Sequence, residues 1–266
     1  MKKNLLKNST VQTLVASLLC IVLGLFLGYL VLLLINPDGA GDAILTVIKN
    51  FWTYNRKASQ IKYLGNTLVK TAPLLMCALS ILFSYKVGLF NIGAAGQYCA
   101  GACAALYAAL AWNMPWYVCI LLGMLAGALL GMLAGALRTL FNVNVVISGI
   151  MLNWITLYLT NLVLGTVKNP TSPYTKTLQS TNPGALIPSL GLEKLFNNEK
   201  SVTIAIPIAV LTAVLVWVVL NKTKFGYELK ATGSNYNAAK YCGMKENQNI
   251  ILTMVIAGAL AGFGAG

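Results

Sequence analysis

The sequence contains no histidine and only six acidic residues among 266. Without histidine, imidazole cannot serve as a general acid or base or as a metal ligand. Charged residues make up 9% of the chain, whereas a soluble domain carries about 25%. This scarcity argues against an ordinary soluble fold. The absences together favour a protein that is not an enzyme and needs no cofactor.

Cysteine is present but sparse, and its spacing is not that of a metal site. Five of the six cysteines lie in apolar stretches, where a thiol behaves as a small hydrophobe. The six are Cys20, Cys77, Cys99, Cys103, Cys119 and Cys242. We therefore expect neither a bound metal nor a disulfide.

Long apolar runs take up most of the chain, which is 58% hydrophobic. About 20 apolar residues suffice to cross a bilayer. The sequence predicts an all-α, polytopic membrane helix bundle with about six complete spans and the start of a seventh. The spans are Val11 to Ile35, about Asn66 to Tyr85, Phe90 to Trp112, Trp116 to Leu137, about Asn144 to Val167, Ser201 to Leu220, and Asn249 onward.

Three segments connect these spans: a mixed segment at 36–64, expected to form an amphipathic helix on the membrane surface, a polar loop at 168–200, and a basic segment at 221–246. Residues 250–266 are apolar to the end and carry no polar anchor, although a span needs anchors on both sides. We expect residues 1–266 to be a single transmembrane domain and an N-terminal fragment of a longer subunit, with C-terminal spans missing.

The excess of 19 Lys and Arg over six Asp and Glu gives a net charge of +13. These cations are scattered at span ends and loops, which favours contact with anionic lipid over binding of nucleic acid. Tight turns on one side hold Lys86 and Arg138, whereas the opposite turn at 112–115 holds no cation. By the positive-inside rule, we expect a multi-pass plasma-membrane protein whose N-terminus and segment 221–246 are cytoplasmic.

Several polar side chains are predicted to lie in or at the ends of spans. Such groups must be satisfied by other protein groups or by water in a cavity. Residues 84–97 are glycine-punctuated between two apolar stretches, which is typical of a broken helix that lines a site but also of an ordinary capped turn. Residue types alone leave both open. No predicted span contains Asp or Glu, which argues against a carboxylate proton relay or cation site.

Gly123, Gly127, Gly131 and Gly135 recur every four residues in one span. This spacing places them on one helix face and lets a second helix approach closely. Helix packing is favoured over a direct role in a pathway.

The basic segment contains a candidate short helix. Asn235 is placed to cap it and Gly243 to end it. A helix held between two spans on the cytoplasmic face suits docking of a soluble partner, although composition alone would permit a plain connecting loop.

Three motifs resemble those of one transporter family. The pattern Thr223-x-x-Gly226-x-x-Leu229-Lys230-Ala231-x-Gly233-x-Asn235-x-x-Ala238-Ala239-x-x-x-Gly243 resembles the coupling segment of ABC importer permeases for simple sugars, nucleosides and branched-chain amino acids. Residues 88–97, Gly-Leu-Phe-Asn-Ile-Gly-Ala-Ala-Gly-Gln, resemble a signature of the nucleoside-type permeases. Residues 144–153, Asn-Val-Val-Ile-Ser-Gly-Ile-Met-Leu-Asn, are similar to that subgroup's next motif.

The resemblance implies a transmembrane permease subunit of an ATP-driven importer, with nucleosides as substrate. The alternatives are simple sugars, a stand-alone secondary transporter or channel, and a membrane scaffold. The implied substrate pathway comprises Phe90, Asn91, Gly93, Gln97, Asn144, Ser148 and Asn153. The implied contacts for ATPase coupling are Gly226, Lys230, Ala231, Gly233, Asn235, Ala238, Ala239 and Gly243.

The implied partners are an ATP-binding subunit, a second permease subunit, an extracellular substrate-binding protein and the lipid bilayer. The sequence has no Gly-Lys dipeptide and hence no G-x-x-x-x-G-K-[ST] phosphate loop, so we expect another chain to hydrolyse ATP.

The sequence departs from the family pattern at three positions. Ala95 and Val145 stand where relatives often carry Glu, and Tyr236 stands where proline is usual. If those carboxylates contact substrate or each other in relatives, their joint loss alters specificity.

Overall fold

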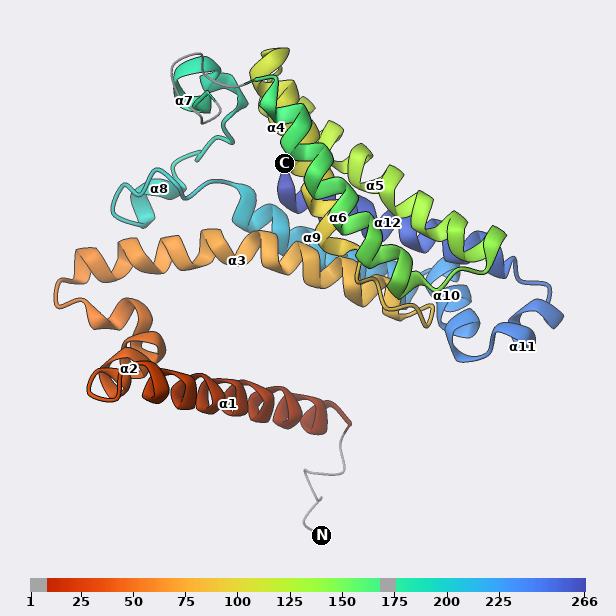
Figure 1. Cartoon of the computed structure of the whole chain (residues 1–266), viewed down its shortest axis with the longest axis horizontal. Helices are drawn as coiled ribbons and strands as arrows, with labels where there is room; N and C mark the ends of the chain where they lie inside the picture. Colours follow the sequence, from red (N-terminus) through yellow and green to blue (C-terminus); the bar gives the residue numbers. More distant parts are fainter. Residues whose placement is uncertain (1–8, 168–175) are drawn as a thin grey trace, which may run out of the picture. The chain divides into compact units, whose positions relative to one another are not determined.

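The computed structural model describes residues 9–167 and 176–266, and the described residues form helices without a strand (Figure 1). Seven of the described helices are long and apolar enough to cross a membrane: Val11–Ile35, Lys57–Tyr85, Ala94–Ala111, Trp116–Phe141, Val145–Gly165, Ala205–Lys222 and Glu246–Ala265. The predicted all-α polytopic bundle is therefore confirmed. That the chain is a fragment stays a prediction.

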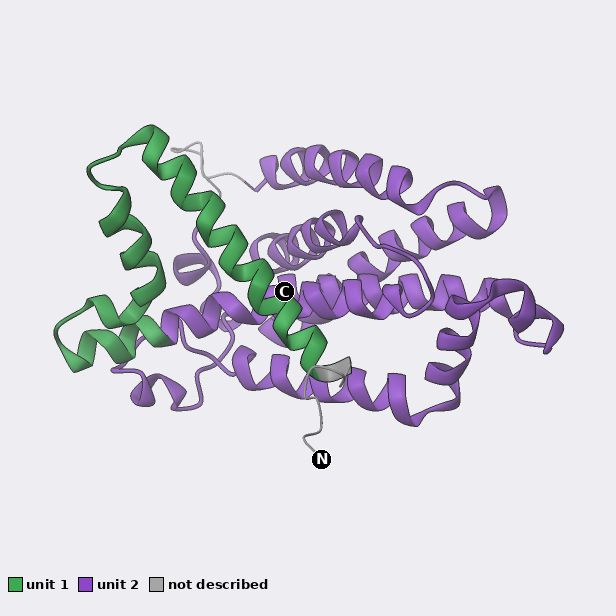
Figure 2. Cartoon of the chain, turned by 90° about the horizontal axis from the view of Figure 1, so that it is seen from below, with its two compact units in different colours: residues 1–64 green, residues 65–266 purple. Residues whose placement is uncertain are grey.

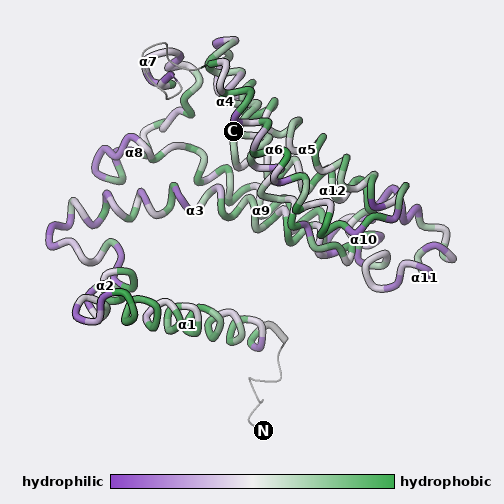
Figure 3. Tube along the Cα trace, viewed as in Figure 1, coloured by the Kyte–Doolittle hydropathy of each residue, from purple (hydrophilic) through white to green (hydrophobic). Residues whose placement is uncertain are grey.

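The chain divides into two compact units, Met1–Leu64 and Gly65–Gly266 (Figure 2). In the first unit, helix α1 (Ser9–Ile35) is joined by a turn to α2 (Ala40–Lys49) and then to the short 3-10 helix η2 (Asn50–Thr53). Helix α1 is hydrophobic along most of its length (Figure 3). Its large apolar side chains are exposed, which suits a helix surrounded by lipid.

The mixed segment at 36–64 is only partly as expected. The predicted helix forms as α2 but ends at Lys49, and its place on the membrane surface stays a prediction. Helix α3 (Lys57–Tyr85) starts nine residues before the expected Asn66. Residues 57–65 contain no proline, and Gln60 Nε2 donates to Tyr54 O at 2.7 Å next to the helix start, so the helix extends through the polar residues.

The second unit contains a core shared by α3, α9 (Ala205–Lys222), α10 (Lys224–Ser234) and α12 (Glu246–Ala265). Phe83 of α3 and Leu229 of α10 are fully buried in it. Burying a large apolar side chain contributes about 1.5–3 kcal/mol. Helix α10 is therefore packed into the bundle, and the segment around it is not a plain loop.

Helices α4 (Ala94–Ala111), α5 (Trp116–Phe141) and α6 (Val145–Gly165) are the other long helices of this unit. The glycine stripe of α5 packs on α12: a Cβ at Gly127 would overlap Gly258 O, and one at Gly131 would overlap Met254 O. The reverse also holds, because a Cβ at Gly262 would overlap Gly123 O. The stripe therefore serves helix packing.

The polar loop predicted at 168–200 is described from residue 176, and residues 168–175 lie outside the described part. The described residues form the short helices α7 (Leu178–Thr181), η3 (Pro183–Ala185) and α8 (Leu192–Leu195). Asn182 Nδ2 donates to Ala109 O at 3.1 Å and to Met114 O at 2.9 Å. This buried amide ties the loop to the end of α4.

Candidate functional site

The helical path is interrupted between α3 and α4. Residues 86–93 form no regular helix, and Gly88 has a φ of +78°, a backbone conformation that glycine adopts without strain. Leu89 N donates back to Ser84 O at 3.2 Å. The glycine-punctuated segment is thus a non-helical connection between two candidate spans, which we call the helical break.

Two buried amides pair at this break, Asn91 within it and Gln97 in the first turn of α4. Asn91 Nδ2 donates to Gln97 Oε1 at 2.8 Å, and Gln97 Nε2 donates to Asn91 Oδ1 at 3.4 Å. Asn91 Nδ2 also lies 3.4 Å from Ser80 Oγ of α3. Both amide side chains are only 1% exposed. The described conformation therefore satisfies these groups internally, as burial requires.

Asn153 of α6 holds the break from the other side. Its Oδ1 accepts from Gly96 N at 2.7 Å, and its Nδ2 donates to Ile92 O at 3.0 Å. Gly93 lies against Gly149, where an added Cβ would stand 2.8 Å from Gly93 N. We call Asn91, Gln97 and Asn153, with the backbone of residues 92–96, the amide cluster.

The other predicted pathway residues lie outside the amide cluster. Phe90 is exposed, Asn144 caps α6 by accepting from Val146 N at 2.8 Å, and buried Ser148 donates to Val145 O at 3.1 Å. Ala95 is exposed in the first turn of α4, whereas Val145 is buried at the start of α6. Ala95 and Val145, the two positions at which the family pattern often has Glu, thus differ in their exposure.

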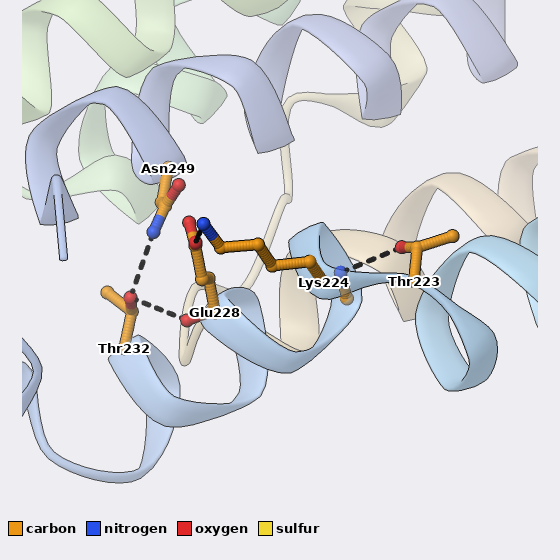
Figure 4. Close-up of polar contacts among 6 residues, drawn as sticks. Thr223, Lys224, Glu228, Thr232 and Asn249 are labelled. Carbon is orange, nitrogen blue, oxygen red and sulfur yellow. Dashed lines mark hydrogen bonds and ion pairs between the residues drawn. The ribbon is translucent and has the colours of Figure 1, made fainter.

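The segment 221–246 contains two helices, α10 and α11 (Tyr236–Tyr241). Thr223 caps α10, since its Oγ1 accepts from Gly226 N at 3.1 Å (Figure 4). Asn249 Nδ2 of α12 donates to Thr232 Oγ1 at 3.3 Å. The first bond caps α10 itself, and the second joins α10 to α12.

Helix α10 touches the helical break through Gly233. A Cβ at Gly233 would overlap Lys86 O, and a Cβ at Gly88 would lie 3.4 Å from Gly233 O. Gly226 makes a similar approach to the end of α9, because a Cβ there would overlap Val219 O. The cytoplasmically expected segment is thus in direct contact with the turn that leads to the amide cluster.

Helix α11 forms as the sequence predicts. Asn235 Oδ1 accepts from Ala238 N at 3.0 Å, and Gly243 follows the helix with a φ of +77°. Ala239 is buried whereas Ala238 is exposed. Among the remaining predicted coupling residues, Lys230 Nζ donates to Asn221 Oδ1 at 2.8 Å, and Ala231 is half-buried.

Tyr236 connects α11 to the start of α12. Its hydroxyl donates to Asn247 Oδ1 at 2.9 Å and lies 3.5 Å from Glu246 Oε1. Burial raises the pKa of Tyr236, Glu246 raises it further, and Arg138 lowers it. The phenol therefore stays protonated at neutral pH and remains a donor. The Tyr236 side chain also lines a cavity of about 480 Å³, whose walls include Arg138, Gly88 and Gly233.

Sequence reasoning missed Ser80, Thr232, Asn182 and Asn249. Their partners lie between 11 and 73 residues away along the chain, so no local motif reveals the contacts. The signal that could have indicated these residues is that each one is polar and lies within or beside an apolar helix. Among the described residues, no group of three or more acidic or cysteine side chains could hold a metal ion.

The described helices thus include seven candidate spans, an amide-held connection between α3 and α4, and a segment at 221–246 that contacts this connection. The chain matches the family described as "Branched-chain amino acid transport system / permease component" over residues 63–266. It belongs to this family, and it is a multi-pass membrane permease subunit of an ABC importer.

Three relatives illustrate its similarity to characterised permeases. A guanosine ABC transporter permease of Bacillus subtilis is 33% identical over 94% of this chain and 70% of its own. A nucleoside ABC transporter permease of Lactococcus lactis is 31% identical over 97% of this chain and 71% of its own. A glucose ABC transporter permease of Haloferax volcanii is 29% identical over 76% of this chain and 55% of its own. No solved structure matches the chain.

Proposed function

We propose that this permease imports nucleosides. Two relatives whose matches cover 94% and 97% of this chain are named for guanosine and for nucleosides. Neutral amides such as those of Asn91, Gln97 and Asn153 suit solutes that carry hydroxyl and amide groups. Phe90, Gly93, Asn144 and Ser148 belong to the same proposed pathway.

The proposed importer contains further subunits. A separate ATP-binding subunit hydrolyses ATP, a second permease completes the membrane part, and an extracellular binding protein delivers substrate. The N-terminus and segment 221–246 face the cytoplasm, where the ATP-binding subunit docks on α11. Membership of the family and the distribution of Lys and Arg over the short turns support these assignments.

The proposed mechanism is alternating access. The observation that supports it is the contact of Gly233 with Lys86 and Gly88. Closure of the ATP-binding subunits pushes on α11 and α10. Because Gly233 lies on the backbone of the 86–88 turn, this motion reaches the helical break without an intervening flexible side chain. The amides of the amide cluster then exchange their mutual hydrogen bonds for bonds to substrate.

Reconstitution in liposomes tests this function. The complete importer is expected to take up labelled guanosine or another nucleoside only with ATP and binding protein present, and this chain alone is expected to take up none. Uptake by the chain alone would instead identify a channel or secondary transporter. A complex whose ATPase activity does not respond to substrate would support a membrane scaffold.

Simple sugars are the second candidate substrate, because one relative is named for glucose. The same liposomes distinguish the two classes by competition. Excess unlabelled nucleoside is expected to suppress uptake of labelled nucleoside, whereas excess glucose is not. Uptake of glucose that nucleosides fail to suppress would overturn the nucleoside proposal.

A further inference from the structure

Helix α6 exposes two aromatic rings near its middle. Trp154 lies one residue from the midpoint of Val145–Gly165, and its ring stacks on that of Tyr158 with centroids 6.2 Å apart and an interplanar angle of 26°. The two side chains are 57% and 66% exposed. Trp and Tyr are instead enriched at the ends of spans, where their polar atoms meet water.

The polar atoms of these rings are not satisfied within the described part of the chain. Neither the indole N–H of Trp154 nor the hydroxyl of Tyr158 has a hydrogen-bond partner there. Hydrocarbon offers no partner at this depth. The two rings therefore present unpaired polar atoms on a face of α6 that is otherwise apolar, with Met151, Ile155 and Leu162 exposed beside them.

A cavity adjoins Trp154 between α4 and α6. Its volume is about 340 Å³, and its walls are Ala95, Gly96, Cys99, Asn153, Trp154 and Leu157. This volume lies within the range of small-molecule sites, which are mostly apolar with a few polar groups. Gly96 and Asn153 belong to the amide cluster, so the cavity and the predicted pathway share a wall.

We propose that this cavity binds the base of a nucleoside, with Trp154 as the ring on which the base stacks. Every base has an aromatic face that stacks on such a ring, and the indole N–H can donate to a base nitrogen or carbonyl. Ala95 leaves room for the base because its side chain is a single methyl group. This inference rests on the proposed function, since it presupposes a nucleoside as substrate.

Substitutions in opposite walls of the cavity test the inference in the complete importer. In Trp154→Leu, the number of nucleosides transported per ATP at saturating binding protein is expected to fall at least about fivefold, as for the loss of one base–aromatic stack. Trp154→Phe is expected to retain most of the transport. Ala95→Phe, which fills the cavity from α4, is expected to cause a loss like that of Trp154→Leu.

Trp217→Leu is the matched control. Trp217 of α9 is 55% exposed, close to the 57% of Trp154, and it lies outside this cavity. Uptake by this variant is expected to equal that of the wild type. An equal loss in Trp217→Leu and Trp154→Leu would show a general effect of removing membrane tryptophans and would overturn the inference.

The outcomes separate this inference from the proposed function. If the wild-type importer transports no nucleoside, the proposed function fails. If it transports nucleosides and both cavity variants match it, only the cavity assignment fails. Photo-crosslinking of an azidopurine nucleoside to the wild-type importer tests the site even if the variants do not assemble. Label within residues 153–158 supports the site, and label confined to other segments overturns it.

Discussion

Asn153 is the side chain whose removal disturbs the helical break most directly. It bonds the backbone at Gly96 and Ile92 through its oxygen and its nitrogen. Asn153→Leu leaves both backbone groups without their partner, at a cost of about 1–3 kcal/mol for each buried group. We expect a lower midpoint of thermal unfolding in detergent and loss of nucleoside uptake.

Asn161→Leu is the control for this substitution. Asn161 lies two turns further along α6 and is exposed, so its replacement is expected to leave the unfolding midpoint unchanged. If the two variants unfold at the same temperature, Asn153 does not hold the break to α6.

The Asn91–Gln97 pair gives a second prediction for single residues. Replacing either amide by Leu leaves the other buried without its 2.8 Å partner, at a cost of about 1–3 kcal/mol. Because the two groups interact, the double variant is expected to lose less free energy of unfolding than the sum of the single losses. A double-mutant cycle on unfolding in detergent measures the difference, and strict additivity would contradict the pairing.

At the level of helices, the α5–α12 contact predicts which glycines tolerate a methyl group. Gly127→Ala is expected to destabilise the protein by about 1–3 kcal/mol, because its Cβ would overlap Gly258 O. Gly28→Ala in α1 meets no atom within 4 Å and is expected to be neutral or stabilising, since Ala favours a helix more than Gly does. Thermal unfolding in detergent compares the two, and equal midpoints would refute this contact.

The contact of α10 with the helical break gives a prediction about coupling. In Gly233→Leu the side chain must displace Lys86 O, and Ala239→Leu must enlarge a buried position. Both changes disturb the contact through which the ATP-binding subunits are proposed to act, so we expect ATP-driven uptake to fall at least about tenfold in each variant. A tenfold fall corresponds to a loss of about 1.4 kcal/mol in coupling free energy.

Gly41→Leu in α2 is the control for coupling, because a Cβ there meets nothing within 4 Å. Its uptake is expected to match the wild type. ATP-coupled uptake that persists in both Gly233→Leu and Ala239→Leu would refute the docking role of segment 221–246.

At the scale of the whole molecule, the number of spans predicts the orientation of the chain. Six of the described candidate spans separate the N-terminus from segment 221–246, so an even number of crossings places both on the same side. Cys242 is exposed in this segment. A membrane-impermeant maleimide is expected to label it only after the membrane is permeabilised, with Cys242→Ser as the unlabelled control. Labelling in intact cells would reverse the proposed orientation.

Much of the fold could be predicted from composition and local pattern. Lipid-spanning helices require long apolar runs, so six spans and most of the seventh were found. Asn235 and Gly243 act on neighbouring backbone groups, so the cap and the end of α11 were found as well. The start of α3 was misplaced, because the polar residues that begin this helix resemble a loop.

The candidate site was predictable by residue type but not by arrangement. Asn91, Gln97 and Asn153 were identified as polar groups in membrane helices, and Trp154 was not identified because an aromatic residue in an apolar run is unremarkable as sequence. The hydrogen bonds of the three amides join residues up to 61 positions apart. Such pairings depend on how the helices pack, which no local pattern specifies.

The amino-acid sequence by itself determined that this protein spans the membrane, where its long apolar runs lie and which segment carries the caps of α11, because hydropathy and capping act over one helix or one turn. Only the tertiary structure decided that α5 packs on α12, that the amides of the helical break bond one another, and that Gly233 lies on the turn at Lys86. These are contacts between distant segments, and close packing selects them only when the whole bundle is assembled.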